Sequence, residues 1–446
     1  MRLIVFLTLY LYAIPSFCRA TVYDSVDGQL HQLFSVKGRM VIIRYHHTFE
    51  DTLFVAENCE ISFRGGSLKG PIVFNNTKLC GDVNIVGSSI SGRIRNKIFN
   101  ASWLCYKDGR NDDAVNINSI LKVCPKIYFP SGEYRLVSEF IPEVDLKGEH
   151  YIKSVRAHIG IHRDNVELQG ENGTVFSTNE RLSILCVYSL PYNINGSVKN
   201  ITIKNIELKT VNDGSVFREW THAIKIIGVN GIKIEGCTIT DFWGDAICLD
   251  HYGDTPLTGE RTRNQEVFIH NNIIIGGPHH NNRNGISVIN GKDVQIKKNT
   301  IKNTSRKDMP GGIDVEPNNS AYTIDNILIE DNTIDSIKGI AAIALFLPEG
   351  SQAHKLTIKN NRVYNSTLGI RICIVTDRTS DNITIVGNIT DENTEPYIFD
   401  GTGISSNWIV SGNTFNRPTN RRIPGTIKVD NITIDNNKKK SSYTVI

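Results

Sequence analysis

The chain lacks a charge excess of either sign. Its 446 residues include 49 Lys and Arg against 46 Asp and Glu, so the formal net charge is only +3 and the isoelectric point is about 8.3. Nucleic-acid-binding domains usually carry a basic stripe and a higher isoelectric point, so we expect no nucleic-acid partner. With 40% hydrophobic residues, the chain can nevertheless bury a large core and is neither disordered nor collagenous.

Long apolar runs are missing after the first 20 residues. At the start of the chain, Arg2 precedes an apolar run over residues 3–14, and a cleavage-type site follows at Cys18-Arg19-Ala20. This arrangement is typical of a secretory signal peptide, and the run is too short to span a bilayer. We predict a signal peptide at residues 1–20, no transmembrane segment, and export to the periplasm, the cell surface or the extracellular space. A retained N-terminal anchor is the alternative.

Cysteines with metal-ligand spacing are absent as well. The nine cysteines include no C-x-x-C pair. Eight remain if Cys18 leaves with the signal peptide, and this even number permits disulfides, although buried free thiols are the favoured interpretation. We predict no metal site, because His279, His280 and the nearby acids lack the usual spacing. The sequence does not indicate an oligomeric state.

Asparagine is missing from the first 57 residues and then becomes abundant, with 44 in all and 30 of them from Asn200 onward. Many of them belong to an internal repeat. In each copy, two apolar residues are separated by one residue, as Val267 and Ile269 are. An Asn follows three positions after the second apolar residue, as at Asn272, and another apolar residue follows two positions after the Asn, as at Ile274. The second apolar position recurs at intervals of 25 to 35 residues from Ile203 to Val410. Variable intervals around a fixed core are typical of a solenoid with loop insertions.

The alternation predicts that each copy is a β-strand with its apolar side chains in a core. Since the interval is too short for a strand-helix-strand unit at every turn, we predict an all-β parallel β-helix with several strands per coil. The recurrent Asn tolerates left-handed turn geometry, and stacked amides would hydrogen-bond from coil to coil. The predicted ladder contains Asn272, Asn299, Asn332, Asn361, Asn388 and Asn413.

A second strand is predicted before each copy, where a small residue precedes an alternating run, as at Gly285-Ile286, Gly339-Ile340 and Gly403-Ile404. Alternation places two columns of residues on the outward face of these strands, and we expect that face to carry the chemistry. The first column is Lys225, Cys248, Ser287, Asp314, Ala341 and Arg371, and the second is Ile227, Asp250, Ile289 and Glu316.

The N-terminal part has its own pattern. Residues 21–100 form a β-rich segment with Gly-rich turns, and Asp112 then caps a short predicted helix through Leu121. A turn at Pro130-Ser131-Gly132 follows. The helix and this turn together resemble the N-terminal segment of the pectin-lyase-like right-handed parallel β-helix superfamily, including secreted Bacteroidetes proteins related to pectate lyases and polygalacturonases. The resemblance implies a right-handed β-helix over residues 101–440, a short N-terminal capping helix and a polysaccharide substrate.

Within this superfamily, polygalacturonase-type hydrolases carry Asn-Thr-Asp, Gly-Asp-Asp, Gly-His-Gly and Arg-Ile-Lys motifs on successive coils. The corresponding stretches here are Trp220-Thr221-His222, Gly244-Asp245-Ala246, Arg283-Asn284-Gly285 and Arg371-Ile372-Cys373. Three of the family's catalytic positions differ, and Asp245 alone is retained. The resemblance therefore does not imply ordinary polygalacturonase chemistry.

Four carboxylates are candidate catalytic groups: Asp245, Asp250, Asp314 and Glu316. A coil spacing of about 4.8 Å puts Asp250 and Glu316 roughly 9–10 Å apart, near the upper end of the range for inverting glycosidases. Asp314 and Glu316 share one strand face, about 7 Å apart at Cβ. One carboxylic acid would protonate the leaving oxygen while another carboxylate activates water. The leading prediction is thus a secreted glycoside hydrolase.

Basic residues lie near this face and could bind an anionic sugar, so an acidic polysaccharide is a candidate substrate. The candidate substrate-binding residues are Lys225, His251, His279, His280, Arg283 and Arg371.

Two other functions remain open. A polysaccharide lyase would eliminate across a uronate whose carboxylate is neutralised by Ca²⁺ or Arg. We predict no cofactor for a hydrolase, whereas Ca²⁺ is a candidate cofactor for a lyase. A non-catalytic glycan-binding or surface solenoid is the other alternative, in which the outward acids are solvated or paired with Lys225 and Arg371.

Overall fold

The computed structural model describes residues 21–22, 27–142, 149–190, 197–252, 263–318, 320–416, 428–435 and 438–439. The predicted signal peptide, residues 1–20, lies outside these ranges. The chain forms two compact units. One contains residues 1–105 and 119–124, and the other contains residues 106–118 and 125–446. No described helix is both long and apolar enough to cross a membrane.

The N-terminal unit is built from short parallel strands after helix α1 (Asp27–Phe34). In its largest sheet, Met40 aligns with Glu60, and Glu60 aligns with Lys78. The coils of this unit are therefore shorter than those of the later repeat. Its other elements are β1 (Thr21–Val22), β2 (Met40–Ile43), β3 (His46–Thr48), β4 (Leu53–Phe54), β5 (Glu60–Phe63), β6 (Ser67–Lys69), β7 (Pro71–Gly81), β8 (Ser89–Ile94), β9 (Phe99–Asn100) and the 3₁₀ helix η1 (Ala101–Trp103).

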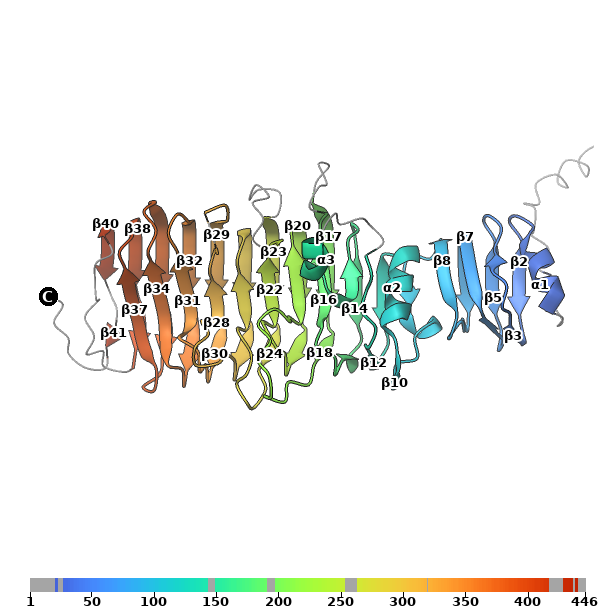
Figure 1. Ribbon diagram of the computed structural model, residues 1–446, viewed down its shortest axis with the longest axis horizontal. Helices are drawn as coiled ribbons and strands as arrows, with labels where there is room; N and C mark the ends of the chain where they lie inside the picture. The colour runs from blue at the N-terminus through green and yellow to red at the C-terminus, as the bar shows by residue number, and fades with distance from the viewer. Residues whose placement is uncertain are drawn as a thin grey trace, which may run out of the picture. The chain divides into compact units, whose positions relative to one another are not determined.

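The C-terminal unit is a right-handed parallel β-helix, as the sequence predicted (Figure 1). Its central coils each add one strand to each of three parallel sheets, whereas the coils at its two ends contribute no strand to the nine-stranded sheet. The nine-stranded sheet contains β13 (Ala157–Ile161), β16 (Ser183–Tyr188), β19 (Ile224–Ile227), β22 (Ile247–Asp250), β25 (Ile286–Val288), β28 (Gly311–Val315), β31 (Ala341–Leu347), β34 (Leu368–Ile374) and β37 (Glu395–Gly401).

The other two sheets of this unit carry the repeat frame. The long-strand sheet runs through β11 (Lys126–Phe129), β14 (Glu167–Gly170), β17 (Val198–Lys204), β20 (Val229–Glu235), β23 (Asn264–His270), β26 (Gly291–Lys297), β29 (Thr323–Glu330), β32 (Gln352–Lys359), β35 (Ser380–Val386), β38 (Ile404–Ser411) and β40 (Lys428–Asp435). The short-strand sheet contains β10 (Asp108–Asp112), β12 (Gly132–Arg135), β15 (Thr174–Ser177), β18 (Glu207–Lys209), β21 (Thr238–Thr240), β24 (Ile273–Ile275), β27 (Thr300–Lys302), β30 (Thr333–Asp335), β33 (Arg362–Tyr364), β36 (Ile389–Thr390), β39 (Thr414–Phe415) and β41 (Lys438–Lys439).

The predicted asparagine ladder is confirmed at the turn between the long-strand and short-strand sheets. Asn299 Oδ1 accepts hydrogen bonds from both the amide nitrogen and Nδ2 of Asn272, each at 3.0 Å. Asn332 Oδ1 accepts the same two bonds from Asn299. The pattern continues through Asn361 and Asn388 to Asn413, and every member is buried. Each amide thus satisfies buried backbone groups on neighbouring coils.

Helix α2 (Ala114–Val123) begins where the sequence predicted. Asp112 Oδ1 accepts a hydrogen bond from the Ala114 amide at 3.0 Å, which satisfies a free donor at the helix start. Asn118 Nδ2 donates to the His158 carbonyl oxygen at 2.8 Å and so joins this part of the helix to β13. The remaining described helix, α3 (Glu149–Ser154), precedes β13 in the chain.

Two strand predictions were wrong, one in its register and the other in the sheet that the strand joins. Asp314 pairs with Ala344, not Ala341, and the column therefore continues through Ala344 to Arg371. The apolar run over residues 341–347 offers no polar alternation that would have fixed its register. The run at Gly403-Ile404 begins β38 of the long-strand sheet, whereas β37 is the strand that joins the nine-stranded sheet on that coil.

The free-thiol interpretation is confirmed for the described part of the chain. None of the eight cysteines there forms a disulfide, and every one except the half-buried Cys80 is buried. Cys237 lies in the ladder position, where its amide nitrogen donates to Asn272 Oδ1 at 2.9 Å. Cys18 falls outside the described residues.

Candidate functional site

The outward face of the nine-stranded sheet is the centre of the candidate site. Alternation puts Ile247 and Leu249 of β22 in the core and aims Cys248 and Asp250 outward, yet all four are buried. Asp314 of β28 is outward and buried too. Charges on this face are therefore removed from water and must be paired or neutralised.

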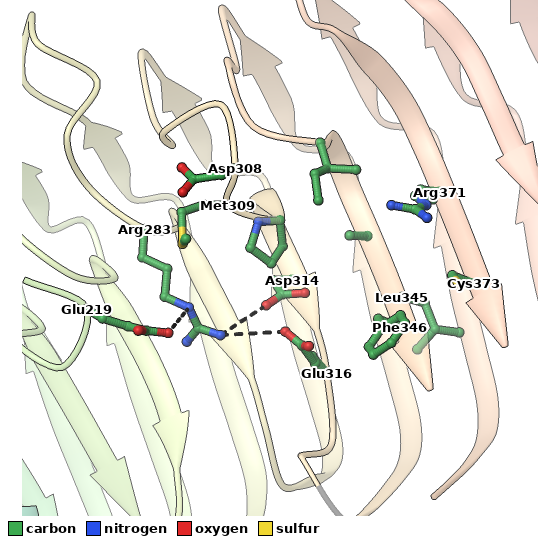
Figure 2. A pocket seen from close by; sticks show the side chains of 13 residues that line it. Glu219, Arg283, Asp308, Met309, Asp314, Glu316, Leu345, Phe346, Arg371 and Cys373 are labelled. Carbon is green, nitrogen blue, oxygen red and sulfur yellow. Dashed lines mark ion pairs between the residues drawn. The ribbon is translucent and has the colours of Figure 1, made fainter. Parts of the chain in front are cut away.

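Arg283 lies among four carboxylates. It follows β24 in the loop that leads to β25, and its amide nitrogen donates to the Gly244 carbonyl oxygen at 2.9 Å. Its guanidinium contacts Asp245 Oδ2 through Nη1 at 3.4 Å, and Glu219 Oε1 through Nε at 3.7 Å. Nη2 approaches two further groups, Glu316 Oε2 at 3.5 Å and Asp314 Oδ2 at 3.8 Å. Figure 2 shows Glu219 on one side of the guanidinium and Asp314 with Glu316 on the other.

The carboxylates open into a cavity of 350 Å³. Loops supply Glu219, Asp308, Met309 and Pro310, while outward positions of three neighbouring strands supply much of the rest. The lining combines apolar side chains with a few charged groups, which is typical of small-molecule sites. The full lining is Glu219, Arg283, Asp308, Met309, Pro310, Asp314, Glu316, Ile340, Ala344, Leu345, Phe346, Arg371 and Cys373.

The Asp314 carboxyl group has a raised pKa in this environment. Burial raises its pKa well above the ordinary value, and the nearby charges of Glu316 and Asp245 add to the effect more than Arg283 offsets it. Asp314 Oδ2 accepts from Asn284 Nδ2 at 3.2 Å and faces Arg283. Asp314 Oδ1 receives no hydrogen bond from any described residue.

Asp245 behaves in the opposite way. Burial would raise its pKa, but Arg283 and His222 together hold it below the ordinary value. His222 Nδ1 lies 3.3 Å from Asp245 Oδ2, and the Asn284 amide nitrogen donates to Asp245 Oδ1 at 3.0 Å. Asp245 is therefore an ionised anchor for Arg283, and it does not line the cavity.

Three of the predicted residues form a separate buried group. Lys225 Nζ lies 2.9 Å from Asp250 Oδ2, and neither side chain lines the cavity. Burial would raise the pKa of Asp250, but Lys225, His251 and His222 lower it below the usual range. His251 stacks on Tyr322 at 4.3 Å between ring centroids, and its Nδ1 lies 2.9 Å from the tyrosine hydroxyl. Asp250 and Glu316, which we predicted to act as a catalytic pair, therefore do not meet at the cavity.

The other predicted binding residues are dispersed. Arg371 lines the cavity, where it pairs with Asp400 at 2.8 Å. His279 is exposed and His280 is half-buried, and neither lines the cavity. Burial, followed by Lys338, lowers the pKa of His280.

Sequence reasoning missed Glu219 and Asp308. Both come from loops that have no place in the repeat frame, so alternation could not place them. Arg306 holds these loops, since it pairs with Asp308 at 2.6 Å and lies over the Phe217 ring at 4.1 Å. Phe217 is two residues from Glu219 in the same loop.

A second hollow of 630 Å³ adjoins the cavity, because Ile340 and Arg371 line both. Lys307 and Lys338 also line this hollow, together with Glu395 and Asp400. We call the two adjoining hollows together the groove.

A buried group of metal-type ligands lies beneath the site. A ring nitrogen of His222, Cys248 Sγ and a carboxylate oxygen of Asp250 all lie within 4.8 Å of one another. Burial, followed by Asp250 and Asp245, raises the pKa of Cys248 well above its ordinary value. These residues come from separate segments of two coils, which explains why no sequence spacing revealed them.

No protein-family model matches the chain, and no curated protein matches it in sequence. Solved structures with a similar backbone include the A-module of a mannuronan C-5 epimerase from Azotobacter vinelandii, at 15% identity and a TM-score of 0.44, covering 76% of this chain and 91% of that one. A surface adhesin of Streptococcus pneumoniae matches at 13% identity and 0.47, covering 77% and 84%. A family 28 exopolygalacturonase from Yersinia enterocolitica matches at 11% and 0.49, covering 79% and 80%. At these identities the similarity concerns the fold alone.

Proposed function

We propose that this protein is an exported glycoside hydrolase with Asp314 as its general acid. The observation that carries the proposal is the Asp314 carboxyl group, which is fully buried, lines the cavity and has a raised pKa. A group that must donate a proton near neutral pH needs a raised pKa of this kind. Asp314 would protonate the glycosidic oxygen of a polysaccharide lying in the groove.

Glu219 is the proposed water-activating carboxylate. It approaches Arg283 from the side opposite Glu316 and Asp314, so a guanidinium group separates it from the acid (Figure 2). A gap of this order is compatible with the roughly 6.5–9.5 Å between carboxyl groups in inverting glycosidases, where the water enters opposite the leaving group. Glu316 keeps the proton on Asp314 through its own negative charge.

The sugar at the reaction centre is proposed to be uncharged. Both cations that line the cavity already have carboxylate partners, Arg283 with four of them and Arg371 with Asp400. A lyase needs a cation to neutralise the uronate carboxylate, and these two are occupied. Arg283 is also no base, because Asp245 and Asp314 raise its pKa although burial opposes this. Elimination therefore fits the cavity less well than hydrolysis.

The test is a screen of the purified chain against neutral and uronate polysaccharides, measuring new reducing ends and ultraviolet absorbance in parallel. Asp314→Asn and Glu219→Gln should abolish the release of reducing ends. Glu330→Gln is the matched control, because Glu330 pairs with Lys297 and Lys359 on the long-strand sheet. Ultraviolet-absorbing products would overturn hydrolysis in favour of elimination. Glycan binding without turnover in the unaltered protein would favour a binding solenoid instead.

A further inference from the structure

We propose that His222, Cys248 and Asp250 form a binding site for a divalent transition-metal ion such as Zn²⁺. Their donor atoms lie within 4.8 Å of one another, and the side chains are buried beneath the outward face of the nine-stranded sheet. A tetrahedral zinc site places its ligands about 2.0–2.3 Å from the metal, so modest side-chain rotations bring three such atoms onto one ion.

His222 provides an independent observation that points to a ligand. Its Nδ1 accepts a hydrogen bond from the Asp245 amide nitrogen at 3.1 Å. Its Nε2 is buried and has no hydrogen-bond partner among the described residues. Metal-bound histidines commonly donate the N–H of one ring nitrogen to a carboxylate and use the other nitrogen as the ligand. His222 Nδ1 also lies 3.3 Å from Asp245 Oδ2, so in the tautomer with the proton on Nδ1 this N–H can be donated to that carboxylate, which leaves the lone pair of Nε2 for a metal ion.

Lys225 would compete with a metal ion for the carboxylate of Asp250. Its Nζ lies 2.9 Å from Asp250 Oδ2, so a metal ion and the ammonium group seek the same carboxylate. Asp250 Oδ1 accepts from the His251 amide nitrogen at 2.8 Å. The Lys225 side chain must turn away, or remain as a neutral amine, when an ion binds. Binding also removes the proton from the Cys248 thiol, since the thiolate is the form that ligates.

The donor types select the ion. One nitrogen, one sulfur and one oxygen suit zinc or cobalt, whereas Ca²⁺ and Mg²⁺ take oxygen ligands. Cys248 and Asp250 do not line the cavity, so the metal would be structural and independent of the proposed hydrolysis.

The test measures zinc in the purified full chain by mass spectrometry after dialysis, in the unaltered protein and in Cys248→Ser. Cys186→Ser is the matched control. Cys186 and Cys248 align with Lys225 from the preceding and following coils, so both are buried thiols beside the same lysine. We expect one zinc ion per chain in the unaltered protein and in Cys186→Ser, and its loss in Cys248→Ser.

Cobalt substitution gives a second readout. A thiolate-to-cobalt charge-transfer band should appear in the unaltered protein and in Cys186→Ser, and should be absent from Cys248→Ser. His222→Gln, which keeps a polar side chain of similar size, covers the case in which Cys248→Ser fails to fold, and it should also lose the zinc. Absence of zinc and of the cobalt band from the unaltered protein would overturn the proposal. So would equal zinc in the unaltered protein and in folded Cys248→Ser.

Discussion

At the scale of single residues, Arg283 organises the charges of the candidate site. Its side chain is only 8% exposed, and it offsets the charges of Asp245, Glu316 and Glu219 while also facing Asp314. Removing one partner from a buried charge network leaves the others uncompensated in a medium of low polarity. This residue therefore matters for stability as well as for the geometry of the cavity.

We predict that Arg283→Met lowers the free energy of unfolding by roughly 3–5 kcal/mol, the usual effect of breaking a buried ion pair. Arg156→Met is the matched control, because Arg156 pairs with Glu139 at 2.7 Å while its side chain is 53% exposed. Loss of such a surface pair changes stability by about 0–1 kcal/mol. Urea unfolding of both variants checks the difference, and similar effects would mean that Arg283 is not the charge anchor described above.

Asp314 predicts a specific pH dependence of stability. Because its pKa is raised in the folded chain, folding is favoured while it is protonated, and this contribution is lost as the pH rises from the unfolded value of about 3.9 toward the folded one. Asn does not titrate, so Asp314→Asn should not show this loss of stability. Between acid and neutral pH, its free energy of unfolding should fall less than that of the unaltered protein. Parallel pH profiles of the two proteins would contradict the raised pKa.

The sequence predicted part of the site. Period-2 alternation placed Asp314, Glu316 and Arg371 on one outward face, and the strand pairing joins Asp314 to Arg371 through Ala344 on the coil between them. Glu219 was missed because loop residues have no fixed phase relative to the strands. Asp250 was placed on the correct face, but the sequence could not reveal that Lys225 on the adjacent strand would pair with it.

At the scale of elements, the asparagine ladder holds successive turns together. Each internal member accepts two hydrogen bonds from the preceding member, and its own Nδ2 donates to the preceding and the following coil. Asn332 accepts from Asn299 and donates to the Ile296 carbonyl oxygen and to Asn361 Oδ1. The sequence predicted this ladder in full, because every member occupies the same position of a fixed frame. Strand register was predictable only where polar and apolar residues alternate, and it failed over residues 341–347.

We predict that Asn332→Ala is strongly destabilising, since each buried donor or acceptor left without a partner costs about 1–3 kcal/mol. The change removes the acceptor of two bonds from Asn299 and the donor to Ile296. Asn318→Ala, at an exposed position, should have little effect. Thermal unfolding of the two variants compares them, and equal unfolding temperatures would show that the ladder contributes nothing to stability.

At the scale of the whole molecule, repetition made the fold predictable while leaving the function open. The coils of the C-terminal unit share one frame, so the β-helix could be predicted from periodicity and the resemblance together. The candidate site also includes side chains from loops, such as Glu219 and Asp308, which the repeat frame does not place. None of the eight cysteines in the described chain forms a disulfide, so the described part of the chain is held together by coil stacking and not by cross-links.

A reducing agent should therefore leave the unfolding temperature of the purified protein unchanged. A structural disulfide typically contributes 2–4 kcal/mol, which would shift the unfolding temperature by several degrees. Differential scanning calorimetry with and without reductant distinguishes the two cases. A clear decrease with reductant would mean that some of these thiols are paired in the folded protein.

General acid catalysis by Asp314 is tested most directly by the dependence of the Asp314→Asn defect on the leaving group. Once the sugar is known, the variant is assayed on the natural glycan and on an aryl glycoside of the same sugar, whose leaving group needs no proton. We predict a loss of roughly 10²–10⁴-fold on the glycan and a much smaller loss on the aryl glycoside. Equal losses on both substrates, or full activity on the glycan, would contradict the assignment of Asp314 as the acid.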